Sequence, residues 1–282
     1  MNLELRHVGL PHFSRDTISS ALANRLAATL DRVELIVAGA PLPLLWHWAF
    51  FPSDAATGDL GPDGHPRLGL EGPLSSYRWR MLAGGRIRSY GPLVTDQEAT
   101  RHSVISSAEQ KESRNGPLLF VTVQHEIHQR GDLVIAEEQD LVYRQRPASS
   151  SMGIGIQRPT APPGGWCDEV SIDAVRMFRF SAVTFNSHRI HYDLPYAKEI
   201  EGYPRLVVQG PLTAIMMLQS AHHHLGRQFE TRSFAFRAQS PLFQDVVFAI
   251  VGEPSASADE VRLTAVRGDG SVGFAATASM RQ

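Results

Sequence analysis

A short polar segment carries the residues best suited to acid–base chemistry. Residues 185–194 read FNSHRIHYDL and hold Asn186, His188, Arg189 and His191. An imidazole titrates near neutral pH, so a loop histidine can take up a proton and release it again. Such a loop suits a ligand with an anionic or carbonyl group, provided that a hydrogen-bond donor lies beside it.

A donor of that kind is predicted at Gly210. Gly210 and Pro211 open the run LTAIMMLQSAHHHL, in which residues 212–218 are almost all apolar. Glycine allows close backbone approach, and proline at the first helical position removes an N–H that would have no partner there. A helix that is apolar all round is a buried one. We therefore predict a buried helix whose N-terminus lies beside the histidine loop.

Other residues with chemical potential have simpler interpretations. His125 and His128 are expected to be strand neighbours that face opposite ways, and they lack a third ligand nearby. The histidines at 222–224 would point in different directions on a helix, so we assign them no ligand role. Cys167 is the only cysteine, which excludes an internal disulfide, and it is expected to be inert. The sequence thus predicts no metal site.

The composition is that of an ordinary globular protein. The 282 residues are 43% apolar and 20% charged, and the formal net charge is -2. No basic field points to nucleic acid or to an anionic membrane, and no apolar run approaches the ~18 residues of a transmembrane helix. The start, MNLELRHVGLPHF, lacks the apolar centre of a signal peptide. We expect a cytoplasmic protein with no nucleic-acid or membrane partner.

The elements of the first half can be placed from their apolar patterns. Residues 14–31 have helical spacing, with Ser14 as the cap. Alternating apolar residues at 33–37 predict a strand, and the apolar segment 41–52 predicts a short buried helix. Further strands are predicted at residues 85–93, 99–110 and, as a hairpin that turns at 130–132, 117–145.

A linker divides the chain. Residues 146–165 are rich in Ser, Gly and Pro and are predicted to join two domains, 1–145 and 166–282. In the second domain, residues 171–185 lead into the histidine loop, and 195–202 predict a short helix. Strands are predicted after the buried helix at residues 231–239, 245–253, 260–267 and 271–280.

A buried helix followed by long antiparallel strands predicts an α+β fold in which a sheet wraps a central helix. This is the hot-dog arrangement. The two halves of the chain share the same coarse order of elements, which suggests one fold used twice. We therefore expect a double hot dog, with two antiparallel sheets that each wrap a central helix and combine into one continuous sheet.

The second half resembles the MaoC-type family of enoyl-thioester hydratases and 3-hydroxyacyl-thioester dehydratases. The family pattern is Asp-x-Asn-Pro-x-His, followed by His-Gly at the head of the hot-dog helix; the matching segments here are 186–191 and 209–210. The form FNSHRIHYD is particularly similar to the itaconyl-CoA and mesaconyl-C4-CoA hydratases and to mitochondrial-type acyl-carrier dehydratases. The first half resembles a non-catalytic N-terminal hot dog that shapes the substrate pocket, on the segments 61–66 (GPDGHP), 80–93 and 121–145.

The chain departs from the family pattern at several positions. Only His191 and Gly210 match strictly; Asn186 replaces the catalytic Asp, and Gln209 replaces the His before the glycine. The resemblance implies two catalytic residues: His191 as the base and Asn186, which can hold a water molecule but cannot exchange protons. The helix start at Gly210 suits a donor to the thioester oxygen or a simple helix cap. The further candidates for substrate binding are Arg189, as a donor to a carboxylate or phosphate or else a solvated charge, Tyr192, which lines the site or only packs, and Gln209.

The implied activity is that of a hydro-lyase. It adds water across the double bond of an α,β-unsaturated acyl-CoA, with a branched C5 dicarboxylyl group such as itaconyl or mesaconyl, to give a hydroxyacyl-CoA such as citramalyl-CoA. No cofactor is expected beyond the coenzyme A of the substrate, and a homodimer is expected. Three alternatives stay open: a 3-hydroxyacyl-carrier-protein dehydratase, an inactive hot dog that binds acyl thioesters, and a thioesterase, for which Asp193 and Glu201 are the carboxylates near in sequence.

Overall fold

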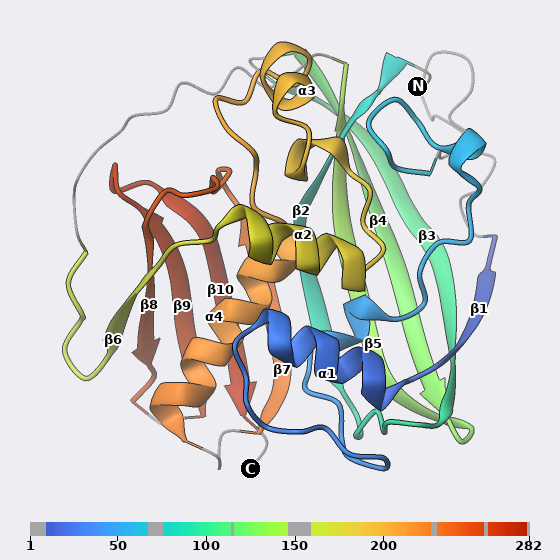
Figure 1. Ribbon diagram of the computed structural model, residues 1–282, viewed down its shortest axis with the longest axis vertical. Coiled ribbons are helices and arrows are strands. Elements are labelled where there is room, and N and C mark those ends of the chain that lie inside the picture. Colours follow the sequence, from blue (N-terminus) through green and yellow to red (C-terminus); the bar gives the residue numbers. More distant parts are fainter. Residues whose placement is uncertain are drawn as a thin grey trace.

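The strands form one continuous antiparallel sheet. The computed structural model describes residues 10–66, 76–113, 116–145, 159–226, 230–256 and 259–280. Ten strands pair in the order β1-β3-β4-β5-β2-β7-β10-β9-β8-β6. Figure 1 shows the sheet curving around the helices, with the first-half strands on one side and the second-half strands on the other. In the described part of the chain, no helix is long and apolar enough to cross a membrane.

The first half of the sheet is built from long strands with little helix against it. Its strands are β1 (His12–Thr17), β2 (Trp79–Ser89), β3 (Glu98–Ser113), β4 (Gly116–Gln129) and β5 (Asp132–Arg144). Its helical segments are α1 (Ser20–Thr29) and the short 3₁₀ turns η1 (Trp46–Ala49) and η2 (Thr57–Asp59). The hairpin between β4 and β5 turns as predicted, because Arg130 and Gly131 both adopt a positive φ.

The second half has shorter strands and more helix. Its strands are β6 (Trp166–Val170), β7 (Thr231–Ala238), β8 (Phe248–Pro254), β9 (Glu260–Arg267) and β10 (Val272–Met280). Its helices are α2 (Ala174–Val183), η4 (Arg189–His191), α3 (Leu194–Glu199) and α4 (Gly210–Leu225). From the outer edge to the junction, the orders β1-β3-β4-β5-β2 and β6-β8-β9-β10-β7 are equivalent, so the sheet repeats one topology twice.

The two halves join where β2 pairs with β7. Residues Gly84–Arg88 lie opposite Ser233–Arg237 in antiparallel register. A Cβ at Gly84 would lie 2.6 Å from the Phe236 carbonyl oxygen, so glycine is needed for this close approach. The pairing stops at Gly84, and the first residues of β2 extend beyond β7 toward the segment that holds α3.

The core lies between the helices and the concave face of the sheet. Helix α4 runs along the second-half strands, with α2 and α1 beside it in Figure 1. Its apolar side chains are almost all buried, as the sequence predicts, and they pack in one cluster with Phe180 of α2 and Phe234 of β7. The helix begins at Gly210, also as predicted. In the first half, the described helical elements between α1 and β2 are the short turns η1 and η2.

Two expectations for the start of the chain are wrong. The segment 14–31 is not one helix: Ser14 lies in β1, which pairs with β3, and α1 is capped by Ser19. The alternating segment 33–37 is not a strand, and Val33 and Leu35 are 98% and 74% exposed. Alternating apolar residues give a segment one apolar face, but a strand also needs a neighbouring strand to pair with. Strand β1 has such a neighbour, because β3 from far along the chain forms hydrogen bonds with it.

Several other helices and strands begin or end at residues that differ from the predicted ones. The lead-in segment 171–185 contains the helix α2, whose cap is Asp173, and the strand predicted from residue 245 begins at Phe248. The helix predicted within 41–52 is a single 3₁₀ turn, entered through Leu45 at φ 73°. Strand β5 ends at Arg144 and β6 begins at Trp166. Residues 146–158 of the predicted linker lie outside the described residues, and the division into two domains stays a prediction.

Candidate active site

Two hydrogen bonds join the histidine loop, residues 185–194, to the segment just before α4. The Val207 N–H donates to the Ile190 carbonyl at 3.0 Å, and the His191 Nδ1 lies 2.7 Å from the Val207 carbonyl oxygen. A carbonyl only accepts, so Nδ1 carries the hydrogen and Nε2 carries the lone pair. Val207 precedes Gly210 by three positions, so this contact places the imidazole next to the first turn of α4.

Burial keeps His191 neutral. The side chain is 8% exposed, and burial lowers its pKa to about 4, against the opposing effect of the bond to Val207. At neutral pH the ring is therefore an unprotonated base whose tautomer is fixed by the backbone. A base of this kind can accept a proton from water at Nε2.

Asn186 shapes the loop from its first residue. Its Oδ1 accepts a hydrogen bond from the His188 N–H at 3.0 Å, which is the geometry of a local Asx turn. The side chain is half-buried. Because its oxygen is engaged by the backbone, the amide nitrogen is the group left to contact a water molecule or substrate.

The start of α4 is held by Gln209. This side chain is fully buried, and its Nε2 donates to the Met177 carbonyl and to Ser181 Oγ of α2, each at 2.9 Å. Both amide hydrogens are thus committed to α2. The Gly210 N–H is the first of the helix, and N–H groups in the first turn have no partner within a helix. Substrate binding by Gly210 and Gln209 stays a prediction, and the geometry favours Gly210.

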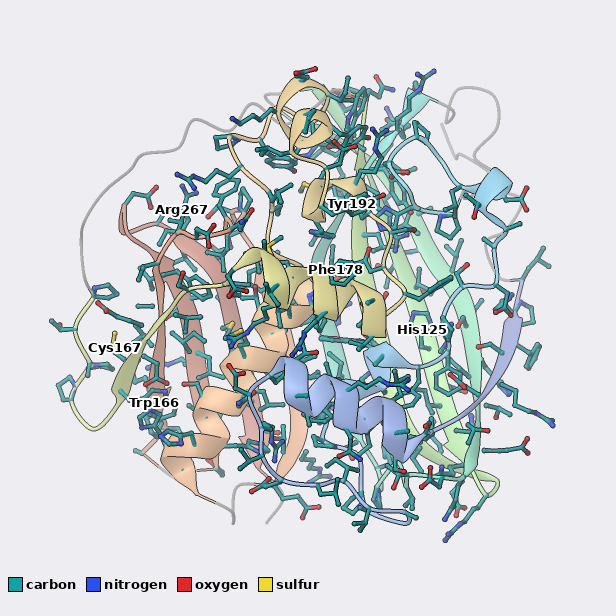
Figure 2. The ribbon with its side chains drawn as sticks, in the orientation of Figure 1. His125, Trp166, Cys167, Phe178, Tyr192 and Arg267 are labelled. Carbon is teal, nitrogen blue, oxygen red and sulfur yellow. The ribbon has the colours of Figure 1, made fainter. Side chains whose placement is uncertain are left out.

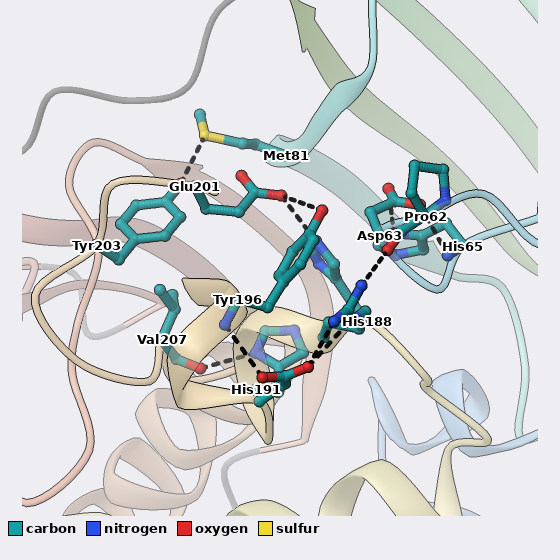
Figure 3. Close-up of polar contacts among 12 residues, drawn as sticks. Pro62, Asp63, His65, Met81, His188, His191, Tyr196, Glu201, Tyr203 and Val207 are labelled. Carbon is teal, nitrogen blue, oxygen red and sulfur yellow. Dashed lines mark hydrogen bonds and ion pairs between the residues drawn. The ribbon is translucent and has the colours of Figure 1, made fainter. Parts of the chain in front are cut away.

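His188 and Glu201 form a buried pair near His191. The His188 ring is 5% exposed and lies 5.3 Å from the His191 ring, and its Nε2 has no hydrogen-bond partner in the part of the chain that the structure describes. That atom points toward Glu201, with 3.9 Å between Nε2 and Oε1 (Figure 3). Tyr196 donates its hydroxyl hydrogen bond to the same carboxyl oxygen at 3.2 Å.

The environments of these two groups disfavour charge on both. Burial lowers the pKa of His188 well below its usual value, and the neighbouring His65 and His191 lower it further. Burial raises the pKa of Glu201 to about 7, and one hydrogen bond from Tyr196 offsets this only in part. Glu201 therefore exchanges a proton near neutral pH, which is the property of a general acid–base group.

The first half of the chain reaches into this cluster through residues 61–66. The His65 ring lies 4.2 Å from the His188 ring, and His65 bonds to Asp63 through its backbone N–H and through Nδ1. The Asp63 carbonyl accepts from the Arg189 N–H at 2.8 Å. A Cβ on Gly64, which has φ 89°, would lie 2.0 Å from the Ser187 carbonyl oxygen. Only glycine allows this loop to press against the histidine loop.

Arg189 and Tyr192, which are predicted to bind substrate, have surroundings that do not by themselves indicate a binding role. Arg189 bonds to Asp193 through Nε and one terminal nitrogen and to the Pro62 carbonyl through the other, so its fork is committed to the chain itself. Tyr192, which is labelled in Figure 2, is 55% exposed. Their contact with substrate stays a prediction, and the geometry gives Arg189 a positioning role.

Two groups of side chains have the composition of a metal site. Asp63, His65 and His188 offer ligand atoms within 4.8 Å of one another, as do His102, Glu126 and His128. In the first group, Asp63 and His65 already bond to each other, which favours a hydrogen-bonded cluster. The other histidines considered in the sequence have separate partners: His125 contacts Ser103, His222 contacts Thr231 and His224 contacts Asp168.

Several residues of this site have no clear signal in the sequence. Asp63 and His65 lie in a segment assigned to a non-catalytic half, and Glu201 follows the short helix α3. The GPDGHP segment carried the only usable signal, because two glycines and two prolines around an Asp and a His are unusual in a simple connection. Its contact with the histidine loop depends on tertiary packing.

Comparison with known proteins places this geometry among acyl-thioester enzymes. The chain is 42% identical over 274 residues to mesaconyl-C(4)-CoA hydratase of Chloroflexus aurantiacus, covering 97% of this chain and 96% of that protein. It is 27% identical over 265 residues to a mitochondrial hydroxyacyl-thioester dehydratase type 2 of Schizosaccharomyces pombe, covering 81% and 85%.

Solved structures show the same fold. HtdX of Mycobacterium tuberculosis matches 96% of this chain and 100% of its own with a TM-score of 0.67 at 16% identity. A MaoC-like dehydratase from Phytophthora capsici matches 96% of each chain with a TM-score of 0.67 at 14% identity. These likenesses confirm the predicted hot-dog fold. The model of the hydroxyacyl-thioester dehydratase type 2 family matches residues 45–244, a span that contains every residue of the site described above, and the chain belongs to this family of hydro-lyases.

Proposed function

We propose that this protein adds water across the double bond of an α,β-unsaturated C5 dicarboxylyl-CoA of the mesaconyl-C4 type, giving citramalyl-CoA. The observation that carries the proposal is His191, a neutral base with Nδ1 fixed on Val207 and Nε2 available, set beside the first turn of α4. The 42% identity to a mesaconyl-C(4)-CoA hydratase supports this acyl group over others.

The reaction needs a base, an acid and a donor to the thioester oxygen. His191 Nε2 takes a proton from water as the water oxygen forms a bond to the β-carbon. The π electrons move toward the thioester, and the Gly210 N–H at the positive end of α4 stabilises the enolate-like oxygen. A proton is then delivered to the α-carbon, so that one water molecule has been added in full.

Two routes can return that proton. The imidazolium of His191 can deliver it directly, which a syn addition allows. Glu201, with its pKa of about 7, can supply the carboxyl that Asn186 lacks, with His188 between Glu201 and His191. The amide of Asn186 holds the water in either case. The same residues run the reverse dehydration, because the forward and reverse reactions follow the same path in opposite directions.

The proposal extends to the cofactor, the oligomeric state and the location of the protein. Hydration by these residues uses only protein groups, and we propose that no cofactor is required beyond the coenzyme A of the substrate. We also propose a homodimer, since each half-sheet ends in an edge strand, β1 or β6, that another copy can cover. The cytoplasm is the proposed location, where acyl-CoA thioesters are available.

The test is a panel of enoyl-CoA and hydroxyacyl-CoA esters assayed in both directions. Hydration removes the enoyl-thioester absorbance, while a thiol reagent reports any thioester cleavage. We expect hydration of mesaconyl-C4-CoA without thiol release. His191→Ala should lower kcat by about 10³-fold, and His223→Ala, on the exposed end of α4, should not change it. A His191→Ala variant with full activity would overturn the proposal, as would thiol release by the unmodified protein.

A further inference from the structure

An arginine without a charged partner among the described residues lies beside the histidine cluster, which consists of His65, His188 and His191. Arg80, on the first residues of β2, is close enough to lower the pKa of both His65 and His188. Within the described part of the chain, no ion pair or hydrogen bond engages its guanidinium. Arg86 on the same strand bonds to two carboxylates, and Arg189 bonds to Asp193.

Asp63, which is within reach of the charge of Arg80, does not form an ion pair with it. Asp63 uses Oδ1 to accept from the His65 N–H and Oδ2 to contact His65 Nδ1. Burial would raise the pKa of Asp63, but the contacts with His65 and the charge of Arg80 together lower it. Asp63 is therefore ionised yet directed at His65, and Arg80 retains its five donors for another anion.

A buried hydroxyl lies on the same face of the sheet. Tyr143 of β5 is directly opposite Arg80 in the antiparallel register, so the two side chains are neighbours on one face. Tyr143 is 4% exposed, and among the described residues its hydroxyl has no hydrogen-bond partner. Buried hydroxyls are normally bonded, and one without a partner beside a free guanidinium indicates a polar ligand.

The surroundings of this pair are apolar. Tyr143 packs in a small buried cluster with Leu119, Val121 and Leu141, and Leu82 lies against it. Leu82 also approaches Gly210, at 3.5 Å from the position of a Cβ there. The patch therefore continues from the first turn of α4 to Arg80. An anion held here is shielded from water, and its attraction to the arginine is stronger for that reason.

We propose that Arg80 and Tyr143 form a carboxylate subsite that selects dicarboxylic acyl groups. This inference rests on the proposed hydration. In a mesaconyl-C4 thioester, the free carboxylate is attached to the carbon that water attacks, so its receptor must lie beside the base. The charge of Arg80 acts on His65 and His188, and the His188 ring lies 5.3 Å from the ring of the base His191. Leu82, two residues along β2 from Arg80, lies against Gly210, so Arg80 meets that condition. The guanidinium binds the two carboxylate oxygens as a fork, and the Tyr143 hydroxyl donates a further bond.

The test compares acyl groups that differ only in the carboxylate. Mesaconyl-C4-CoA and 3-methylcrotonyl-CoA have the same branched skeleton, with a methyl group in place of the carboxylate in the second. Their saturated analogues, methylsuccinyl-C4-CoA and isovaleryl-CoA, serve as competitive inhibitors, so the comparison does not depend on turnover of the neutral thioester. Any contact of Arg80 with coenzyme A cancels in the ratio.

Arg80→Gln should weaken binding of methylsuccinyl-C4-CoA by about 100-fold and lower kcat/KM for mesaconyl-C4-CoA by at least as much. It should change binding of isovaleryl-CoA by less than about threefold. Tyr143→Phe should give about a tenfold loss with the same selectivity. Arg88→Gln, an exposed charge change on the same strand, should alter neither ratio. Arg80→Lys keeps the charge without the fork and should fall between wild type and Arg80→Gln.

An equal loss for the charged and the neutral thioester would overturn the subsite, because it would show that Arg80 acts on the fold or on the histidines. Unchanged binding of both would overturn it as well. Failure of the proposed function has a separate signature, since the unmodified protein would then hydrate no member of the enoyl-CoA panel, while the binding ratio would still report on Arg80. If Arg80→Gln does not fold, Arg80→Lys and Tyr143→Phe decide the question by the same ratios.

Discussion

Among the described residues, each half of the molecule buries one glutamate, and the two have opposite properties. Glu137 of the first half and Glu201 of the second are both 4% exposed. Burial alone would raise both pKa values, but the bonds and charge of His47 and its neighbours lower that of Glu137 to about 2. Burial dominates at Glu201, whose pKa rises to about 7. The same side chain at the same depth is thus a fixed charge in one place and a proton carrier in the other.

The difference comes from the number of donors. Glu137 accepts from His47 and Trp48 and from Gln139, at 2.9, 2.7 and 2.9 Å. Glu201 accepts one bond, from Tyr196, and faces an imidazole nitrogen with no bond of its own. A satisfied buried carboxylate stabilises a core, whereas an under-satisfied one is free to react. The contrast separates a structural polar cluster from the one that we propose takes part in catalysis.

The largest expected effect is on stability in the first half. Glu137→Ala leaves His47 and Trp48 buried without their acceptor and should lower the free energy of unfolding by about 3–5 kcal/mol. Urea denaturation monitored by circular dichroism measures this. Turnover per folded molecule should stay near that of the wild type. A large loss of turnover in a well-folded Glu137→Ala protein would break the distinction between the two clusters.

The dependence of stability on pH should separate the glutamates next. The folded pKa of Glu201 lies above its usual 4.5, so its contribution is present below pH 4.5 and is lost as pH rises toward 7, by about 3 kcal/mol. His125, His191 and His222 act in the opposite direction, because burial lowers each pKa to about 4. Their contribution is present above pH 6.5 and is lost as pH falls toward 4.

Wild type should therefore gain stability between pH 4 and pH 6.5, since these three histidines, with His65 and His188 acting in the same direction, outweigh one carboxyl. Glu201→Gln removes the opposing group and should make this gain steeper. Urea midpoints measured at several pH values in this range give the slopes. Equal slopes for wild type and Glu201→Gln would show that the pKa of Glu201 is close to that of an ordinary carboxyl.

A third expected effect concerns rate. Glu201→Gln keeps the shape and the acceptor for Tyr196 but cannot exchange a proton, so kcat should fall by about 30-fold, or about 2 kcal/mol, if the carboxyl supplies the proton at the α-carbon. The hydration assay across pH 5–8 measures this. If His191 alone returns the proton, Glu201→Gln should match wild type, and the pH profile should be unchanged.

The smallest expected effect tests how the first half enters the site. Gly64→Ala forces a methyl group against the Ser187 carbonyl, which should displace Asp63 and His65 and lower kcat/KM by about tenfold. Gly39→Ala is the matched control: its φ of 78° is equally unusual, but nothing lies within 4 Å of the added carbon. Gly39→Ala should cost only about 1 kcal/mol of stability from backbone strain. Equal kinetics for the two variants would show that the contact does not matter for catalysis.

The sequence predicts the elements that carry their own local signals. The start of α4 at Gly210 and the hairpin at Arg130 and Gly131 are confirmed, because a glycine before a proline and a glycine-containing turn restrict the backbone directly. Strand β1 was mistaken for helix because its identity depends on β3, more than 80 residues away in register. Such pairing leaves no trace in local periodicity.

The residues of the candidate site likewise divide into those with a signal in the sequence and those whose position depends on packing. His191 and Gly210 are 19 positions apart, and the resemblance of their segments to one family pattern already relates them. His65 and Arg80 come from the other half, and their position beside His188 depends on how the sheet closes. The environment that raises the pKa of Glu201 is likewise a property of packing. Residue types suggest which groups can react, whereas burial and partners decide which do.

The contact between Gly64 and the Ser187 carbonyl has a consequence for how such chains can change. A duplicated fold invites the exchange of halves, since each half carries a complete set of strands. Here the loop of one half and the loop of the other must fit atom against atom. A chimera that joins the first half of this chain to the second half of a relative should regain activity only when residues 61–66 and 185–194 are inherited together. The repeated topology supplies two similar scaffolds, but the contact between these loops means that neither half can be replaced alone.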